Sequence, residues 1–312
     1  IVICKTFSMN KKALLVLLFL SFFAIGNNSA QQVNVDSLEN LLKTHITEDT
    51  AKVNLLNKIT LRIYEKDAEK ARNYSVQAGE LADKLNFPKG KAESVRLIGL
   101  SYIKFDKTMA LTHLQSALKM AEDMDDKFQL IKCHNAMGKA NMNSGRDSVA
   151  IMHYQKALTL AETLDNKKEM AKCLSDLSFA YYLQGKNKMA IEGFNKVIVL
   201  LKELGDQELL SSAYIRLGTL YATEGNLPMA LECFQNCLKI SEDLNNKVGV
   251  FMCINSIGNI YSNQKNLEKS LEYRKKALKI AEELKDKARI TMCLNNLGIY
   301  YFETNNPKAM DC

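Results

Sequence analysis

The residues that most often carry catalysis or bind metals are present in this sequence, but their spacing fits neither task. Its four histidines are never separated by the intervals of zinc motifs such as HExxH, or CxxC paired with HxxxH. It contains no glycine-rich phosphate loop, nucleophile elbow or kinase signature. Glutamates recur in step with a 40-residue interval, at Glu122, Glu162, Glu242 and Glu282, which indicates a solvated face. We therefore expect no catalytic residues, no metal site, no cofactor and no enzyme activity.

Four of the eight cysteines follow the same interval, at Cys133, Cys173, Cys253 and Cys293, with Ala213 at the missing place. This pattern predicts one recurring position for a small buried side chain, because a free cysteine behaves as a small hydrophobe. Successive copies would lie roughly 10 Å apart at usual helix spacings, too far for a disulfide. Cys233 and Cys237 share one helix face and are expected to pack, because a metal would need further ligands. His134 lies where other copies hold a larger apolar residue, so we expect it to pack too.

The composition favours helices. Of the 312 residues, 47% are hydrophobic and 25% charged, with only 14 glycines, 3 prolines and no tryptophan. The formal charge is +7, but Lys5, Lys11 and Lys12 precede the expected mature protein, so residues 31–312 carry +4. Because no block of lysine and arginine is present, we expect no nucleic-acid partner.

The N-terminus has the pattern of an export signal over residues 9–30. Lys11 and Lys12 precede thirteen residues, Ala13 to Ile25, that are apolar except for one serine. A membrane-spanning helix needs roughly 20 such residues, so we expect no membrane span here. Cleavage is expected after Gly26 or Ala30, which makes the protein exported and extracytoplasmic, for example periplasmic; the alternatives are an uncleaved anchor and an N-terminal core helix. Residues 1–8 precede the natural-looking start and are expected to be a non-native extension.

A repeat of 39 to 40 residues dominates the rest of the chain. One position holds a small residue, at Gly99, Gly138, Ser178, Gly218, Gly258 and Gly298. Three residues later the chain has Tyr102, Asn141, Tyr181, Tyr221, Tyr261 and Tyr301. Twelve residues after the small residue come Ala150, Ala190, Ala230 and Ser270. We expect the small residues to let two helices approach each other closely and the aromatic side chains to fill the space beside that contact.

Apolar residues at intervals of three and four divide each unit into two helices, which predicts an all-α, right-handed α-solenoid of stacked antiparallel helix pairs. Gly145, Gly185 and Gly225 are expected to end first helices with a positive φ, and polar turns with capping residues are expected between units. Residues 31–49 are predicted to be a polar segment with a short capping helix. The array of residues 50–312 divides at about 50–90, 91–129, 130–170, 171–210, 211–250, 251–290 and 291–312. The last unit is incomplete, so we expect the natural protein to continue.

Leu217-Gly218-x-x-Tyr221 followed by Ala230-x-x-x-Phe234 resembles the tetratricopeptide repeat. The period resembles the longer, 40-residue form found in kinesin light chain and in exported sensor regions of bacterial signalling proteins. Two features depart from the usual pattern: the first helix does not open on a large aromatic residue, and the unit does not close on proline. The resemblance implies the fold and says little about the ligand.

In related repeat proteins the first helices line a concave face that binds a peptide or protein, and amides there suit a peptide backbone because they both donate and accept hydrogen bonds. The equivalent positions here, with nearby polar residues, are Asn135, Lys139, Asn255, Asn259, Asn263, Asn295 and Asn296. The alternative interpretation is that these asparagines only tolerate exposure. Two functions follow: an exported, non-catalytic binding scaffold, or the sensory region of a membrane signalling protein whose membrane span and output domain (a kinase, cyclase or DNA-binding regulator) lie beyond residue 312.

Overall fold

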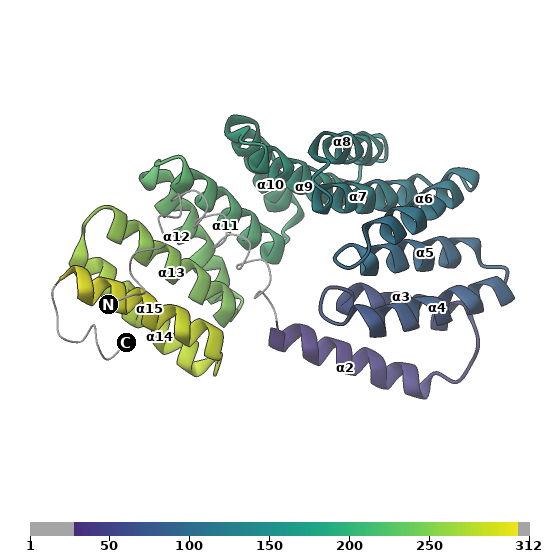
Figure 1. Cartoon of the computed structure of the whole chain (residues 1–312), viewed down its shortest axis with the longest axis horizontal. Coiled ribbons are helices and arrows are strands. Elements are labelled where there is room, and N and C mark those ends of the chain that lie inside the picture. Colours follow the sequence, from purple (N-terminus) through teal and green to yellow (C-terminus); the bar gives the residue numbers. More distant parts are fainter. Residues whose placement is uncertain (1–27, 305–312) are drawn as a thin grey trace. The chain divides into compact units, whose positions relative to one another are not determined.

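The computed structural model describes residues 28–304, which form fourteen helices and no strand within that range (Figure 1). The prediction of an all-α fold is confirmed. Residues 1–8, most of the predicted export signal and the last eight residues of the chain lie outside the described range. Among the described residues, none of the helices combines the length and the apolar composition that crossing a bilayer would require.

The helices divide into two compact units. The N-terminal unit, residues 27–200, contains α2 (Asn28–Thr44), α3 (Thr50–Ile63), α4 (Ala68–Lys84), α5 (Pro88–Tyr102), α6 (Lys107–Asp123), α7 (Lys127–Asn143), α8 (Asp147–Thr163) and α9 (Lys167–Leu183). The C-terminal unit begins at Leu201 and contains α11 (Gln207–Thr223), α12 (Leu227–Asp243), α13 (Lys247–Asn263), α14 (Leu267–Glu283) and α15 (Lys287–Glu303). The boundary between the units lies within α10 (Asn187–Leu204).

The turns have the chemistry that the sequence predicts. Gly145, Gly185 and Gly225 have φ values of 70°, 72° and 78°, which confirms their role in ending first helices. The helices that follow the turns between units are capped by Asp126, Asn166, Asp206, Asn246 and Asp286, whose side chains accept hydrogen bonds from backbone N–H groups three residues ahead. Local residue types therefore determine where each helix begins and ends.

Within each pair, the two helices approach closely at the small residue of the first helix. A Cβ on Gly138 would lie 2.5 Å from the Tyr154 ring, and one on Gly99 would lie 2.7 Å from Leu114. In the C-terminal unit, a Cβ on Gly218 would lie 3.0 Å from Cys233, and one on Gly258 would lie 3.3 Å from Tyr273. The alanines that follow at the predicted spacing, Ala150, Ala190 and Ala230, are fully buried in the second helices.

Successive first helices also pack on one another. In the N-terminal unit α3 contacts α5, α5 contacts α7 and α7 contacts α9; in the C-terminal unit α11 contacts α13. Successive second helices make few or no contacts with one another. These helices are α4, α6 and α8 in the N-terminal unit and α12 and α14 in the C-terminal unit. Each unit is therefore a curved stack with its first helices on the inner side. We call the exposed side chains of these first helices the inner face of the unit.

Candidate functional site

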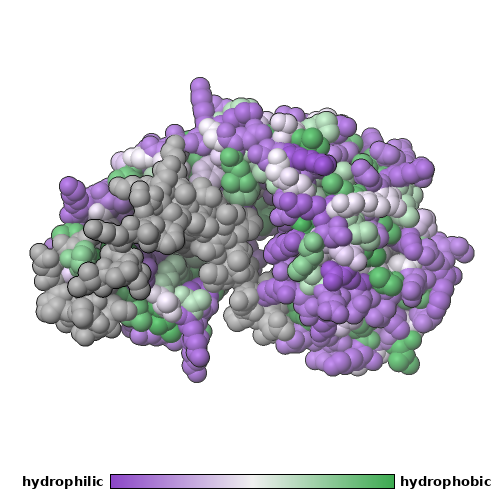
Figure 2. All heavy atoms as spheres, viewed as in Figure 1, coloured by the Kyte–Doolittle hydropathy of each residue, from purple (hydrophilic) through white to green (hydrophobic). Residues whose placement is uncertain are grey.

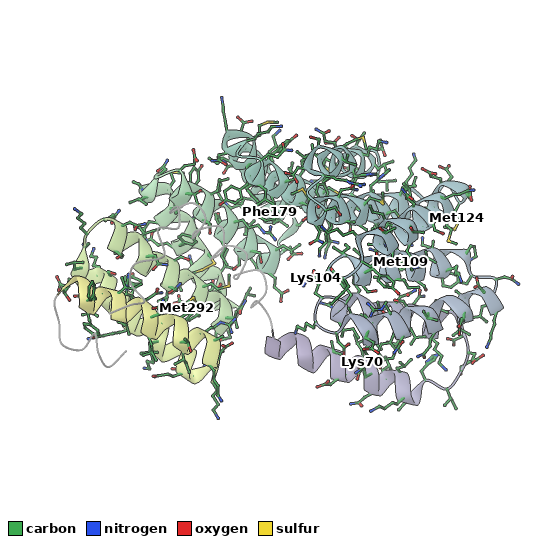
Figure 3. All side chains as sticks on the ribbon, in the orientation of Figure 1. Lys70, Lys104, Met109, Met124, Phe179 and Met292 are labelled. Atoms are coloured by element: carbon green, nitrogen blue, oxygen red, sulfur yellow. A yellow bond between two sulfur atoms is a disulfide. The ribbon has the colours of Figure 1, made fainter. Side chains whose placement is uncertain are left out.

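Each first helix of the C-terminal unit has a stripe of exposed or half-buried side chains along one face. On α13 the stripe is Met252, Ser256, Asn259 and Asn263, at intervals of four, three and four residues. On α11 it includes Ser212, Ile215, Arg216 and Thr219, and on α15 it includes Met292, Asn295, Asn296, Ile299 and Phe302. These residues form the C-terminal inner face, and Figure 3 labels Met292 on α15.

The structure separates the predicted binding residues of this face into two groups. Asn255 is only 3% exposed, and its Oδ1 accepts a hydrogen bond of 3.2 Å from Asn296 Nδ2. Arg274 of α14 donates to the Asn296 carbonyl oxygen and, over 3.1 Å, to Ser262 Oγ. Asn255 and Asn296 therefore connect α13 to α15, and Asn255 is not open to a ligand. This corrects the expectation that all the asparagines face a ligand.

The second group consists of Asn259, Asn263 and Asn295. Asn263 and Asn295 are exposed and Asn259 is half-buried. No other described residue donates to or accepts from their side-chain amides. Each amide therefore offers a donor and an acceptor to a molecule outside the protein.

Lys139, the predicted cationic residue of the N-terminal inner face, is held within the protein. Its Nζ donates to Tyr64 Oη over 2.7 Å and forms an ion pair with Glu65, at the far end of α3. Burial alone would lower the pKa of Lys139, but the neighbouring Tyr64 and Glu65 outweigh that effect and raise it. Lys139 is therefore charged and already paired, although its side chain is 45% exposed.

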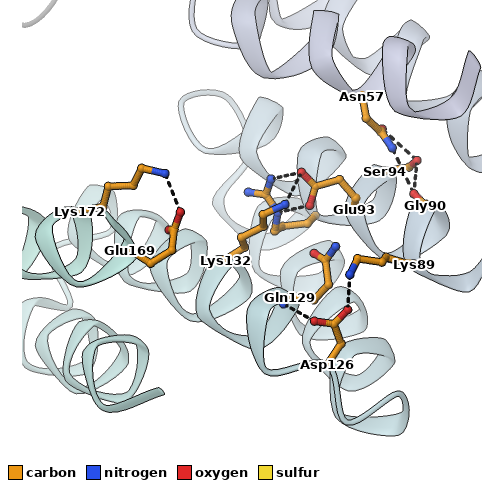
Figure 4. A network of polar contacts seen from close by, with 11 residues as sticks. Asn57, Lys89, Gly90, Glu93, Ser94, Asp126, Gln129, Lys132, Glu169 and Lys172 are labelled. Atoms are coloured by element: carbon orange, nitrogen blue, oxygen red, sulfur yellow. Dashed lines mark hydrogen bonds and ion pairs between the residues drawn. The ribbon is translucent and has the colours of Figure 1, made fainter. Parts of the chain in front are cut away.

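Further charges on the first helices of this unit, some of them buried, are also paired. Arg96 donates to both Glu93 carboxylate oxygens, over 3.0 and 2.7 Å, and Lys132 lies 3.5 Å from the same carboxylate (Figure 4). Burial raises the pKa of Glu93, but Arg96 and Lys132 reverse this and hold it below its usual value. Lys172 is paired with Glu169 at 2.7 Å on α9. Hydrophilic residues cover most of the visible surface of the N-terminal unit (Figure 2).

Asn135 is bound within the N-terminal unit. Its Nδ2 donates to Cys173 Sγ over 3.2 Å, while its buried Oδ1 has no partner among the described residues. Because Oδ1 is buried and Nδ2 is bound to Cys173, Asn135 serves packing within the unit and does not present its carbonyl oxygen to a ligand.

The structure corrects one expectation about the cysteines. Cys237 of α12 and Cys253 of α13 form a disulfide, with Cα atoms 6.5 Å apart. Cys133, Cys173 and Cys293 are buried and unpaired, and burial raises the pKa of each thiol. Cysteines at equivalent positions of successive repeats are not paired with one another, as expected. Cys237 does not belong to that series, and it reaches Cys253 from the preceding helix.

The histidines include one buried pair. His134 of α7 and His153 of α8 face each other with their Nδ1 atoms 3.0 Å apart. Burial and the neighbouring His153 lower the pKa of His134 to about 4, and burial lowers the pKa of His153 as well. Both rings are therefore neutral at pH 7. Among the described residues, no group of three or more histidine, cysteine or acidic side chains could hold a metal ion.

Comparisons with known families agree with this geometry. Two family models, each described as a tetratricopeptide repeat, match residues 211–244 and 250–309. This part of the chain therefore carries tetratricopeptide repeats. A comparison with curated proteins finds no match to its sequence.

Several solved structures have a similar fold. The apo form of RapI is 15% identical, with a TM-score of 0.69, over 81% of this chain and 72% of that one. A signal transduction ATPase with numerous domains that carries a tetratricopeptide repeat sensor, from Pyrococcus horikoshii, is 15% identical, with a TM-score of 0.64, over 93% of this chain and 46% of that one. A Rap protein complexed with Competence and Sporulation Factor is 13% identical, with a TM-score of 0.56, over 94% of this chain and 92% of that one. At these identities the likeness concerns the fold.

Proposed function

We propose that this tetratricopeptide-repeat protein is a non-catalytic scaffold that binds a peptide or protein segment on the inner side of its first helices. The observation that carries the proposal is the set of uncommitted amides on the C-terminal inner face, Asn259, Asn263 and Asn295. An amide that both donates and accepts matches the alternating N–H and C=O groups of a peptide backbone. The similar fold of the Rap protein complexed with Competence and Sporulation Factor supports a partner of this kind.

The test is a selection of peptides by the immobilised chain, followed by measured affinities. Peptides enriched from a random display library are synthesised with a fluorescent label and titrated with the protein by polarisation. The double variant Asn259→Ala, Asn295→Ala is expected to weaken binding by about tenfold or more, since it removes two amide contacts. Asn236→Ala on α12 is the matched control and should bind as the wild type does. Equal affinity of the double variant and the wild type would refute binding at this face.

We also propose that the protein is exported. The apolar segment of residues 13–25 behind two lysines supports export, and so does the Cys237–Cys253 disulfide, because disulfides persist mainly in oxidising compartments. Fractionation of the native host with an antibody to the repeat region should place the protein outside the cytoplasm. Maleimide labelling of the unreduced, denatured protein should leave Cys237 and Cys253 unmodified. A cytoplasmic protein with both thiols labelled would contradict the proposal.

The alternative is the sensory region of a membrane signalling protein whose output domain follows residue 312. The similar fold of a protein with a tetratricopeptide repeat sensor supports this alternative. Reading the coding sequence downstream of Cys312 separates the two: an apolar run of about 20 residues favours the sensor, and a stop codon after a capping helix favours the scaffold.

A further inference from the structure

The junction between α12 and α13 differs chemically from equivalent junctions in the protein. At three places where the second helix of one pair meets the first helix of the next, two alanines share a buried apolar cluster with a cysteine. These sets are Ala117, Ala121 and Cys133; Ala157, Ala161 and Cys173; and Ala277, Ala281 and Cys293. Between α12 and α13 the same positions hold Cys237, Ser241 and Cys253, all fully buried.

The junction between α12 and α13 is also more polar on the side of α11. Ser211 Oγ of α11 lies 3.1 Å from Ser241 Oγ and 3.4 Å from Cys237 Sγ. At two of the other junctions the place of Ser211 is taken by a buried apolar residue, Ile131 or Phe251. A hydroxyl gains much less than an apolar group from leaving water. We therefore expect packing alone to hold α12 to α13 less strongly than it holds α8 to α9.

A disulfide joins the two helices at this same place. The Cα atoms of Cys237 and Cys253 are 6.5 Å apart, within the range that a disulfide spans. Gly249, in the first turn of α13, allows this close approach, because a Cβ there would lie 2.5 Å from Ser241 Oγ. The covalent bond thus occupies the junction at which apolar packing is weakest.

We propose that the Cys237–Cys253 disulfide is a redox-dependent cross-link that holds α12 to α13, so that the C-terminal unit opens at this junction when the bond is reduced. Forming the S–S bond takes two electrons and two protons from the two thiols. They pass to the disulfide of a protein or small-molecule oxidant, which becomes two thiols, and a dithiol reductant reverses the exchange. Both cysteines are fully buried, so exchange in either direction requires the junction to open. This inference does not depend on any ligand.

An apolar cluster limits how far the reduced junction opens. Phe234 of α12 is buried together with Ile257 and Ile260 of α13. Separating the two helices would expose these side chains to water, which costs free energy. We therefore expect reduction to make opening more frequent without unfolding the unit.

Hydrogen exchange of the full chain, isolated from an oxidising compartment, tests the cross-link. The amides of α12 and α13 are expected to exchange slowly in the oxidised protein. The bond closes a loop with a sequence separation of 16 residues. Reduction should therefore accelerate their exchange by about a hundredfold, the effect of losing a disulfide around a loop of that size. The amides of α7 and α8 should not respond. Alkylation of the denatured, unreduced protein, read by mass spectrometry, verifies that the bond is present.

Three variants make the test specific. Cys237→Ala introduces the alanine found at the other junctions; its α12 and α13 amides should exchange faster than in the oxidised wild type and equally with and without reductant. Cys253→Ala, which matches Ala213 of the preceding repeat, serves the same purpose if Cys237→Ala does not fold. Cys233→Ala is the matched control. Cys233 lies one turn before Cys237, is unpaired and faces Gly218, so this variant should keep the redox dependence.

Each outcome decides the inference. Acceleration confined to the helices around the junction, and lost in Cys237→Ala, supports the cross-link. Equal exchange of α12 and α13 in the oxidised and reduced wild type overturns it. Equal acceleration in every helix also overturns it, because the bond would then stabilise the whole fold and not this junction. Alkylation of both Cys237 and Cys253 without reductant would show that no bond forms and would overturn it as well.

Discussion

The two inner faces of this protein use equivalent positions in different ways. Lys139 and Asn259 each follow the small glycine of a first helix, Gly138 in the N-terminal unit and Gly258 in the C-terminal unit. Lys139 is bound to Tyr64 and Glu65, whereas Asn259 contacts no hydrogen-bonding partner among the described residues. The packing positions of the repeat are thus shared, and the exposed positions determine whether a unit satisfies its own polar groups or leaves them for a ligand. The predictions below test that contrast.

The largest expected effect is the loss of the buried cation Arg96 on α5 of the N-terminal unit. Arg96→Met leaves Glu93 with Lys132 alone, and we expect the free energy of unfolding to fall by about 3 kcal/mol, as for other broken buried pairs. Urea unfolding measures it. The double variant Arg96→Met, Glu93→Gln should recover part of the loss. If Arg96→Met is as stable as the wild type, the pair does not stabilise the N-terminal unit.

Acidification is expected to lower the stability of the N-terminal unit by a similar amount and to change that of the C-terminal unit little. The pKa of His134 falls from about 6.5 in the unfolded chain to about 4 in the fold, so its contribution is present above pH 6.5 and is lost as pH falls towards 4. The loss is at most about 3 kcal/mol. Hydrogen exchange of α7 and α8 should accelerate between pH 6.5 and 4.5 after correction for intrinsic rates, while α13 and α14 should change little.

His134→Leu is the control for this pH dependence. Leucine stands at the equivalent position of the next repeat, Leu174, so the variant should fold and lose most of the acid sensitivity of α7 and α8. If this variant and the wild type show the same pH profile, the acid sensitivity arises elsewhere.

A smaller difference is expected between two glycines at equivalent positions. Gly138→Ala puts a Cβ 2.5 Å from the Tyr154 ring, whereas Gly258→Ala puts one 3.3 Å from Tyr273 Cβ. We expect Gly138→Ala to lower the free energy of unfolding by about 1–3 kcal/mol through overpacking. Gly258→Ala should change the free energy of unfolding by less than about 1 kcal/mol, because alanine has a higher helix propensity than glycine. Thermal and urea unfolding compare them, and a larger loss in Gly258→Ala would reverse the ranking.

The smallest effect on stability is expected from Lys139→Ala. Part-exposed ion pairs contribute about 0–1 kcal/mol, so unfolding should change little. Peptide binding should also be unchanged if the ligand lies on the C-terminal inner face, in contrast to Asn259→Ala. A Lys139→Ala variant that loses peptide affinity would place the ligand on the N-terminal inner face instead.

Much of the fold follows from local chemistry, and for that reason could be predicted. Gly145 ends a helix because glycine adopts positive φ at low cost, and Asp126 begins one because its carboxylate caps free N–H groups. The recurring small residues and alanines indicate the helix pairs because close contact between helices needs both.

The details of the candidate site depend on contacts far apart in the sequence, and these could not be predicted. The partners of Lys139 lie 74 and 75 residues away. Asn255 is buried because Asn296 reaches it from α15, 41 residues later in the chain. The sequence does contain one signal for this site: Arg274 interrupts the series of aromatic residues at Tyr154, Phe194 and Phe234, and in the structure it donates to the Asn296 carbonyl.

The contact between Lys139 and Tyr64 has a mechanical consequence. In most repeat arrays each helix pair touches only its neighbours, so each junction between pairs bends independently of the others. Lys139 lies on α7 and Tyr64 directly after α3, so their contact spans the intervening helix pair, α5 and α6. Opening the junction on either side of the α5–α6 pair would lengthen this one contact between Lys139 and Tyr64. The contact therefore couples bending at these two junctions, but only as far as its energy of about 0–1 kcal/mol allows.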